Sequence, residues 1–306
     1  MLSNLVGLFL LIGVGYLAVK LNRLPLSSTG ILTSLLMKVA MPATVFTSLI
    51  RPFDTSFIHD AFLMIGIGAA LFFLYAAISF WLSRWVFRVP LGRRGTWMLC
   101  ATFSNNGFMG FPVAYALFGD EGMALAVMLS IPFNLLMYSM GAWQASLDGQ
   151  GEGGEKLSWR GILFNEINIT LFVGLVFYVL QLPVPQVILT PLNHLSNITT
   201  PLSMIITGMI LAGAPLASLF HDRDAISCVS ARLVILPLLS CLILLPVPLA
   251  NPMVSRVILV VMAMPCASVT TAMAQRYRGS TELAARSGCL SSLLCIVTLP
   301  LIALLL

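Results

Sequence analysis

The stretch Ser104-Asn-Asn-Gly-Phe-Met-Gly-Phe-Pro112 lies inside an apolar segment that begins near Thr96 and ends near Phe118. Glycine favours non-helical backbone, and proline removes an amide donor, so a continuous helix is not expected here. In hydrocarbon a broken helix is tolerated only inside protein or beside a wet cavity. A simple kink is one interpretation, because glycine and proline are common in membrane helices. The two adjacent asparagines favour the other, a functional break at mid-membrane.

The composition indicates a membrane protein. Of the 306 residues, 59% are hydrophobic and 9% are charged, whereas soluble domains carry about 25% charged residues. The expected fold class is all-α and polytopic. The net charge of +5 need not indicate a nucleic acid partner, and none is predicted, since membrane proteins concentrate Lys and Arg in cytoplasmic loops. The six cysteines form no CxxC pair and the three histidines are scattered, so neither a metal site nor a cofactor is predicted.

Ten apolar runs are each near the roughly 20 residues that cross a bilayer. Their approximate limits are 2–19, 30–50, 60–83, 95–118, 122–146, 160–181, 190–215, 226–248, 253–277 and 282–305. Basic residues gather in the odd-numbered links, including Arg223 and Arg232 around the seventh, whereas the even-numbered links hold only Arg51 and Arg256. By the positive-inside rule the odd-numbered links are cytoplasmic. We therefore expect a multi-pass protein of the cytoplasmic (inner) membrane with both termini outside.

A polar link near the middle divides the chain into two halves. We predict a first repeat of five spans over residues 1–146, a cytoplasmic linker over 147–159 and a second repeat of five spans over 160–306. An odd number of spans in each half makes the two halves opposite in orientation. Pro201 precedes Pro265 by 64 residues, and Pro42 lies the same distance before Asn106. This spacing predicts inverted repeats, each with a broken fourth helix.

Four strings of residues resemble the auxin efflux carrier family, which belongs to the superfamily of the bile-acid/sodium symporters. They are Asn105-Asn-Gly-Phe-Met-Gly-Phe-Pro112, Phe118-Gly-Asp-Glu-Gly122, Met41-Pro42 and Met264-Pro265. The resemblance covers essentially the whole chain and is that of a bacterial member. One departure is that many relatives begin the sixth span with Asn-Pro, where this chain has Asn165-Glu166.

The resemblance implies more than the spacing does. It implies that spans four and nine cross at mid-membrane, that spans one, two, six and seven form a scaffold, and that spans three to five and eight to ten form a mobile transport domain. It also implies an elevator-like movement and a homodimer joined through the scaffold. The substrates it implies are organic anions, auxin in plants and dicarboxylates such as malonate in bacteria.

Elementary physics also makes the crossover a candidate anion site. Each half-helix N-terminus presents unpaired amide donors and about half a positive charge, which suits a carboxylate. The candidate substrate-binding residues are Asn105, Asn106, Gly107, Gly110, Pro112, Pro265, Cys266, Ser268, Thr270 and Thr271. The asparagines offer neutral donors and the glycines allow close backbone approach. For the hydroxyl residues the alternative is a bond to their own backbone or a neighbouring helix.

Three polar residues are candidates for a charge or coupling role: Lys38, Glu166 and Gln275. Lys38 could attract an anion or snorkel to the interface, and Glu166 could favour a helix N-terminus or carry a proton. Pro42 and Pro201 are predicted to break scaffold helices. The interiors of the presumed transport-domain spans contain no Asp or Glu, which argues against a carboxylate-based sodium site or proton relay. The coupling ion, H+ or Na+, stays open.

The sequence thus predicts a secondary transporter of small carboxylates embedded in a lipid bilayer. One alternative is a sodium-coupled organic-anion symporter, and another is a membrane sensor that binds such a ligand without moving it. An enzyme is not expected, because the spans contain no evident nucleophile–base pair or metal cluster.

Overall fold

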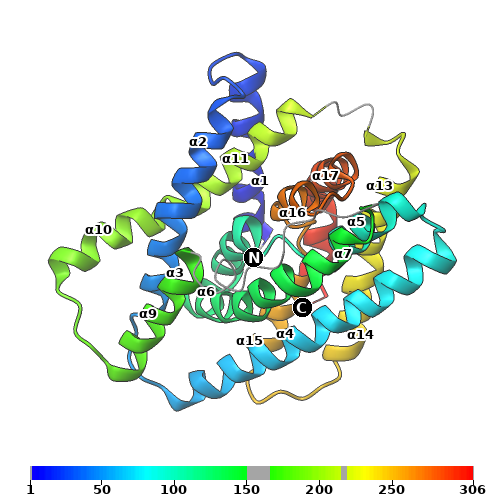
Figure 1. Ribbon diagram of the computed structural model, residues 1–306. Helices are drawn as coiled ribbons and strands as arrows, with labels where there is room; N and C mark the ends of the chain where they lie inside the picture. The colour runs from blue at the N-terminus through cyan, green and yellow to red at the C-terminus, as the bar shows by residue number, and fades with distance from the viewer. Residues whose placement is uncertain (1, 150–165, 215–218, 306) are drawn as a thin grey trace.

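The computed structural model describes residues 2–149, 166–214 and 219–305, and the regular elements in these ranges are helices (Figure 1). Seven of them are long and apolar enough to cross a membrane: Ser3–Lys20, Ser28–Leu49, Thr55–Val86, Asn106–Ser146, Gln186–Gly213, Arg223–Leu244 and Thr281–Ala303. The protein is therefore a polytopic α-helical membrane protein, as predicted. Most of the predicted linker 147–159, the start of the predicted sixth span and Asn165 lie outside the described residues.

The helices before residue 150 are α1 (Leu2–Lys20), α2 (Ser28–Leu35), η1 (Leu36–Ala40), α3 (Met41–Leu49), α4 (Thr55–Trp81), η2 (Leu82–Val86), α5 (Leu91–Thr102), η3 (Asn106–Gly110), α6 (Phe111–Leu136), η4 (Met137–Gly141) and α7 (Ala142–Ser146). The elements labelled η are single π-helical turns that continue a neighbouring α-helix. Those after residue 165 are α9 (Glu166–Leu180), α10 (Gln186–Asn197), α11 (Thr199–Gly213), α13 (Arg223–Ser230), η5 (Ala231–Ile235), α14 (Leu236–Leu244), α15 (Pro252–Met262), α16 (Val269–Arg276) and α17 (Thr281–Ala303).

Two helix breaks lie side by side in the interior. One separates α5 from η3 and the other separates α15 from α16. The Asn105 amide donates to the Pro265 carbonyl at 2.8 Å, and the Ala267 amide donates to the Phe103 carbonyl at 3.0 Å. Buried backbone groups must be paired, and these bonds satisfy groups that neither broken helix can satisfy within itself. The predicted break over Ser104–Pro112 is narrower in the structure: residues 103–105 separate α5 from η3, whereas Gly107 and Gly110 lie in η3 and Pro112 lies in α6. This short break is paired with a second one around Pro265.

A turn at Gly119 explains part of the difference between seven long helices and ten predicted spans. Gly119 has a φ of 67° inside α6, a conformation that glycine adopts without a steric penalty. The stretch Asn106–Ser146 therefore contains two segments, which meet where the sequence places the link between spans four and five. The breaks also shorten α5, α15 and α16, and α9 begins at the edge of the described residues. The count of ten stays a prediction.

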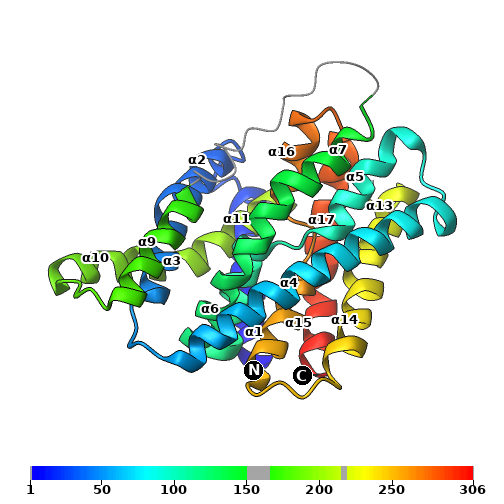
Figure 2. The same cartoon turned by 60° about the horizontal axis from the view of Figure 1, so that its bottom comes forward.

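One end of the molecule gathers links that the sequence places together. Arg93 of α5 forms ion pairs with Asp222 and Asp224 at the start of α13, both at 2.5 Å, and Arg286 of α17 reaches Asp222 at 3.1 Å. In Figure 2 α5, α7 and α16 share this end, whereas the two chain termini lie at the other end, near the α14–α15 connection. There Asn251, which caps α15, donates to Asp60 at 2.7 Å.

Helices α1 and α11 pack closely against each other. A Cβ atom added at Gly15 would collide with the backbone of Ile205, and one added at Gly208 would collide with the backbone of Ile12. Small residues let membrane helices approach this closely, so that van der Waals packing holds them. Helices α9 and α10 pack on α3, and Figure 1 shows these helices on one flank of the molecule.

Candidate functional site

Two cavities lie at successive turns of the same pair of helices. Met41 of α3 and Phe111 of α6 line the first, of about 380 Å³, which we call the crossover cavity because Asn105 and Asn106 also line it. Thr44 and, one turn further along α6, Tyr115 line the second, of about 830 Å³, which we call the polar cavity. The two cavities thus lie one after the other along the interface between α3 and α6, about one helical turn apart.

The crossover cavity brings together six of the residues that the sequence singles out: Asn105, Asn106, Gly107, Ser268, Lys38 and Glu166. The rest of its wall is mostly apolar and includes Phe108, Phe133 and Met137. An apolar cavity with a few convergent polar groups is typical of a small-molecule site.

Asn106 is the polar group whose burial most needs an explanation. Its side chain is 2% exposed, and neither Nδ2 nor Oδ1 has a hydrogen-bond partner. A buried amide without partners costs about 1–3 kcal/mol, and such groups in native structures call for a reason. Asn106 also lines the crossover cavity, so its amide is a candidate contact for a ligand there.

Asn105 differs from Asn106 because its groups are used within the protein. Its backbone amide donates to the Pro265 carbonyl, and its side-chain Nδ2 donates to the Ser268 hydroxyl at 3.0 Å. Its own carbonyl accepts from the Gly110 amide at 2.9 Å. Asn105 therefore joins the two broken helices.

Two helix N-termini meet at the crossover cavity. Helix η3 begins at Asn106 and α16 begins at Val269, and both residues line the cavity. The first amides of a helix have no carbonyl one turn earlier to bind, and the N-terminus carries about half a positive charge. Gly107 and Phe108, in the first turn of η3, also line the cavity. The arrangement is suited to an anion.

The other predicted binding residues lie outside the cavity lining: Gly110, Pro112, Pro265, Cys266, Thr270 and Thr271. The Thr270 hydroxyl donates to the Ala267 carbonyl at 2.7 Å, which is the backbone bond that the sequence left as an alternative. The Cys266 amide donates to Ser291. A Cβ atom at Gly110 would lie 3.2 Å from the Asn106 Oδ1 atom, so glycine leaves room beside that amide.

Of the three residues considered for a charge role, two line the crossover cavity and the third does not. Lys38 of η1 and Glu166, the first residue of α9, are exposed and line the crossover cavity with opposite charges. Gln275 is exposed on α16 and does not line either cavity. Pro42 lies in the first turn of α3, and Pro201 of α11 lines the polar cavity.

The sequence analysis missed Ser130, Asn134 and Tyr138, which also line the crossover cavity. Asn134 is largely buried and donates to the Asn168 Oδ1 atom at 2.8 Å. An amide side chain inside an apolar span is expensive, and that signal was available at position 134.

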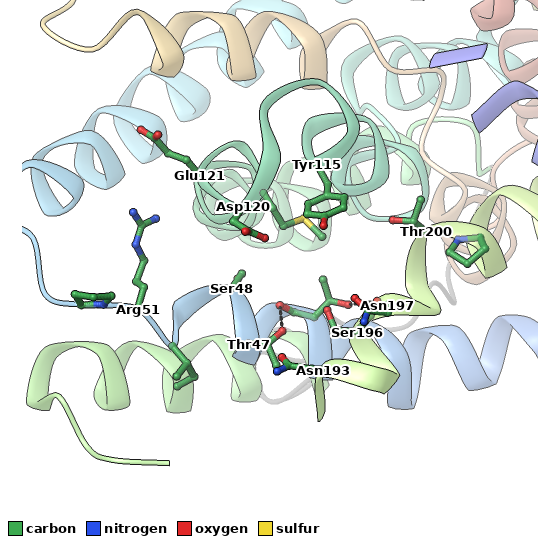
Figure 3. Close-up of a pocket in the computed structure, with 15 residues that line it drawn as sticks. Thr47, Ser48, Arg51, Tyr115, Asp120, Glu121, Asn193, Ser196, Asn197 and Thr200 are labelled. Atoms are coloured by element: carbon green, nitrogen blue, oxygen red, sulfur yellow. Dashed lines mark hydrogen bonds between the residues drawn. The ribbon is translucent and has the colours of Figure 1, made fainter. Parts of the chain in front are cut away.

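The polar cavity is larger but less suited to an anion. In Figure 3 Asp120 and Tyr115 on α6 face Ser48 and Ser196 across the opening. Asp120 and Glu121 both line the polar cavity, and two carboxylates repel a third. Arg51 also lines the polar cavity, but its guanidinium packs over the ring of Phe57, 4.4 Å from the ring centroid. The smaller crossover cavity is therefore the better candidate for an anion site.

Arg232 is the main correction to the sequence analysis, which placed it around a link. It lies in η5, between α13 and α14, and is completely buried. Its Nε donates to the Met264 carbonyl at 3.0 Å, and one terminal nitrogen donates to the carbonyls of Ala101 and Thr102 at 3.0 and 3.1 Å. The other donates to the Met262 carbonyl. The signal was available, because Arg232 lies inside the predicted span 226–248 and a charged residue within an apolar span is expensive.

In the described residues, this helical membrane protein has paired helix breaks beside a cavity with a few polar groups, an arrangement typical of membrane transport proteins. The family model described as "Membrane transport protein" matches residues 1–303. The chain belongs to this family, which confirms the resemblance to the auxin efflux carriers.

Two archaeal relatives are similar to the chain. An uncharacterized transporter of Methanothermobacter thermautotrophicus is 29% identical over 301 residues, which are 98% of this chain and 96% of the relative. An uncharacterized transporter of Methanocaldococcus jannaschii is 29% identical over 205 residues, 66% of each chain.

Proposed function

We propose that the protein is a secondary transporter of small organic anions, and that the crossover cavity binds the substrate carboxylate. The unpartnered amide of Asn106 carries this proposal, because a carboxylate accepts hydrogen bonds from an amide nitrogen. The adjoining helix N-termini and Lys38 supply positive potential. Malonate-like and auxin-like acids are the substrate classes, and the chain is not an enzyme.

The proposed mechanism is an elevator. In this proposal ten helices form two inverted repeats; spans one, two, six and seven are the scaffold, and spans three to five and eight to ten carry the substrate. The position of the two cavities at successive turns of α3 and α6 supports a path along the interface between these groups. The proposed homodimer forms through the scaffold, in the inner membrane and with both termini outside.

The experiment that tests the binding site is thermal unfolding of the detergent-purified protein with malonate, other dicarboxylates or indole-3-acetate. A ligand that binds only the folded state raises the melting temperature by mass action. We expect one acid to stabilise the wild type but not Asn106→Ala. Asn193→Ala is the matched control, because Asn193 lines the polar cavity and its loss should leave the response intact.

Uptake into proteoliposomes separates transport from sensing. Wild-type protein should move the stabilising acid, and Asn106→Ala should not. Stabilisation without any flux would favour the ligand sensor. Equal stabilisation of both Asn106 forms would place the carboxylate elsewhere.

A further inference from the structure

The four hydrogen bonds of Arg232 converge on the C-terminal ends of the two broken helices. Thr102 is the last residue of α5, and Met262 is the last residue of α15. Each helix C-terminus carries about half a negative charge, so the two ends together carry about one. The single positive charge of Arg232 matches this sum. Its bonds also satisfy carbonyls that have no amide partner one turn later.

The same carbonyls are of the kind that binds coupling cations. In transporters with discontinuous helices, unwound backbone carbonyls and half-helix C-termini coordinate Na+. Here the Arg232 guanidinium already donates hydrogen bonds to carbonyls at both breaks. Tyr75 of α4 lies against it, with the ring centroid 5.3 Å from the guanidinium carbon, and the Tyr75 hydroxyl is itself bonded to Ser240 at 2.7 Å.

We propose that Arg232 is a resident cation, fixed where a coupling Na+ would otherwise sit between the broken helices. Arg232 is then a positioning residue: it holds both C-terminal ends together while the opposite N-termini remain free for the anion. Because the charge is covalently attached, it stays with the helices throughout the transport cycle. Transport consequently requires no Na+ at the crossover. This consequence for coupling rests on the proposed transport function.

The test compares the thermal stability of four forms in Na+, Li+ and choline buffers of equal ionic strength. Arg232→Ala leaves the carbonyls unoccupied, Arg232→Met fills the space without charge, and Arg232→Lys keeps the charge. We expect the melting temperature of the wild type to be the same in all three salts, and the same insensitivity to the salt for Arg232→Lys. Arg232→Ala should melt about 5 °C or more below the wild type in choline and regain part of that loss in Na+ or Li+.

Arg232→Met separates a cation site from a general packing effect. It should be destabilised equally in all three salts. Guanidinium at concentrations far below denaturing should restore Arg232→Ala but not Arg232→Met. An Arg232→Ala variant that responds to Na+ no more than Arg232→Met would overturn the proposal. Stabilisation of the wild type by Na+ would overturn it too, even if the substituted proteins fail to fold.

These measurements use no substrate, so they are independent of the proposed anion transport. A Na+ response of Arg232→Ala in a protein that neither binds nor moves any carboxylate would leave the resident cation standing and refute the transport proposal. If carboxylate uptake by the wild type requires a Na+ gradient, the transport proposal stands and the resident cation is refuted.

Discussion

The backbone amide of Asn105 donates to the carbonyl oxygen of Pro265 across 2.8 Å, and this bond joins two segments 160 residues apart in the sequence. Beside it the isolated bridge between Ser104 and Cys266 runs antiparallel. Two broken helices thereby complete each other's hydrogen bonding in the buried interior of the protein. The neighbouring Asn106 amide is left without a partner, and the first two predictions test this contrast.

Asn105→Ala should destabilise the protein. It removes the side-chain bond to Ser268, which is worth about 1 kcal/mol. Thermal or denaturant unfolding in detergent measures the loss. In a double-mutant cycle with Ser268→Ala, the two losses should be non-additive. Fully additive losses would show that this bond contributes nothing.

Asn106→Ala should leave the stability of the ligand-free protein unchanged or raise it. The substitution removes two buried polar atoms that have no partners, so no hydrogen bond is lost and a desolvation cost is relieved. The same unfolding measurement checks this, with Asn105→Ala as the comparison. A loss as large as that of Asn105→Ala would mean that the amide is already satisfied inside the protein.

Gly208→Ala should destabilise the packing of α11 on α1 by about 1–3 kcal/mol. The new Cβ would meet the backbone of Ile12, which cannot swing aside as a side chain can. Gly13→Ala is the matched control on α1, since a Cβ at Gly13 meets nothing within 4 Å, and it should be neutral or slightly stabilising. Unfolding temperatures of both variants decide the point, and equal temperatures would contradict it.

Acid should weaken the ion-pair cluster around Asp222. Burial alone would raise the pKa of this carboxyl, but hydrogen bonds from Arg93, the Ala225 amide and Arg286 outweigh it and hold the pKa below its usual value of 3.8. A carboxyl whose pKa is lowered in the folded state contributes its full stabilisation of the fold at pH values above its pKa in the unfolded chain. This contribution disappears as the pH falls through the pKa in the folded state.

Asp222→Asn should therefore be less stable than the wild type at neutral pH and lose less stability below about pH 4. Thermal unfolding from neutral to acidic pH measures both effects. Glu282→Gln is the control, because Glu282 is 68% exposed in its pair with Arg286 and exposed pairs contribute little. Parallel pH curves for the wild type and Asp222→Asn would rule out this role for Asp222.

The class of protein and the positions of the helix breaks could be predicted from the sequence, because both depend on local chemistry. Runs of about 20 apolar residues favour membrane helices, and a cluster of glycine and proline indicates an interrupted helix nearby, although Gly107, Gly110 and Pro112 themselves lie in η3 and α6. Pro265 was predicted as a break from its spacing, and the turn at Gly119 falls in the predicted link between spans four and five. Asn105 and Asn106, however, looked equivalent, since adjacent residues of one type give the same local signal.

The sequence by itself determined that this chain is a polytopic helical membrane protein of the transporter family with an interrupted helix close to Asn105. Only the tertiary structure decided that Asn105 is bonded within the protein, that Asn106 is unpaired, and that Arg232 lies between the two breaks. The physical reason is that hydrogen-bond partners in these breaks come from other segments of the chain: Ser268 lies 163 residues from Asn105, and Arg232 lies 131 residues from Ala101 and 32 from Met264. A local pattern shows which groups need partners, but the packing of distant helices determines which groups find them.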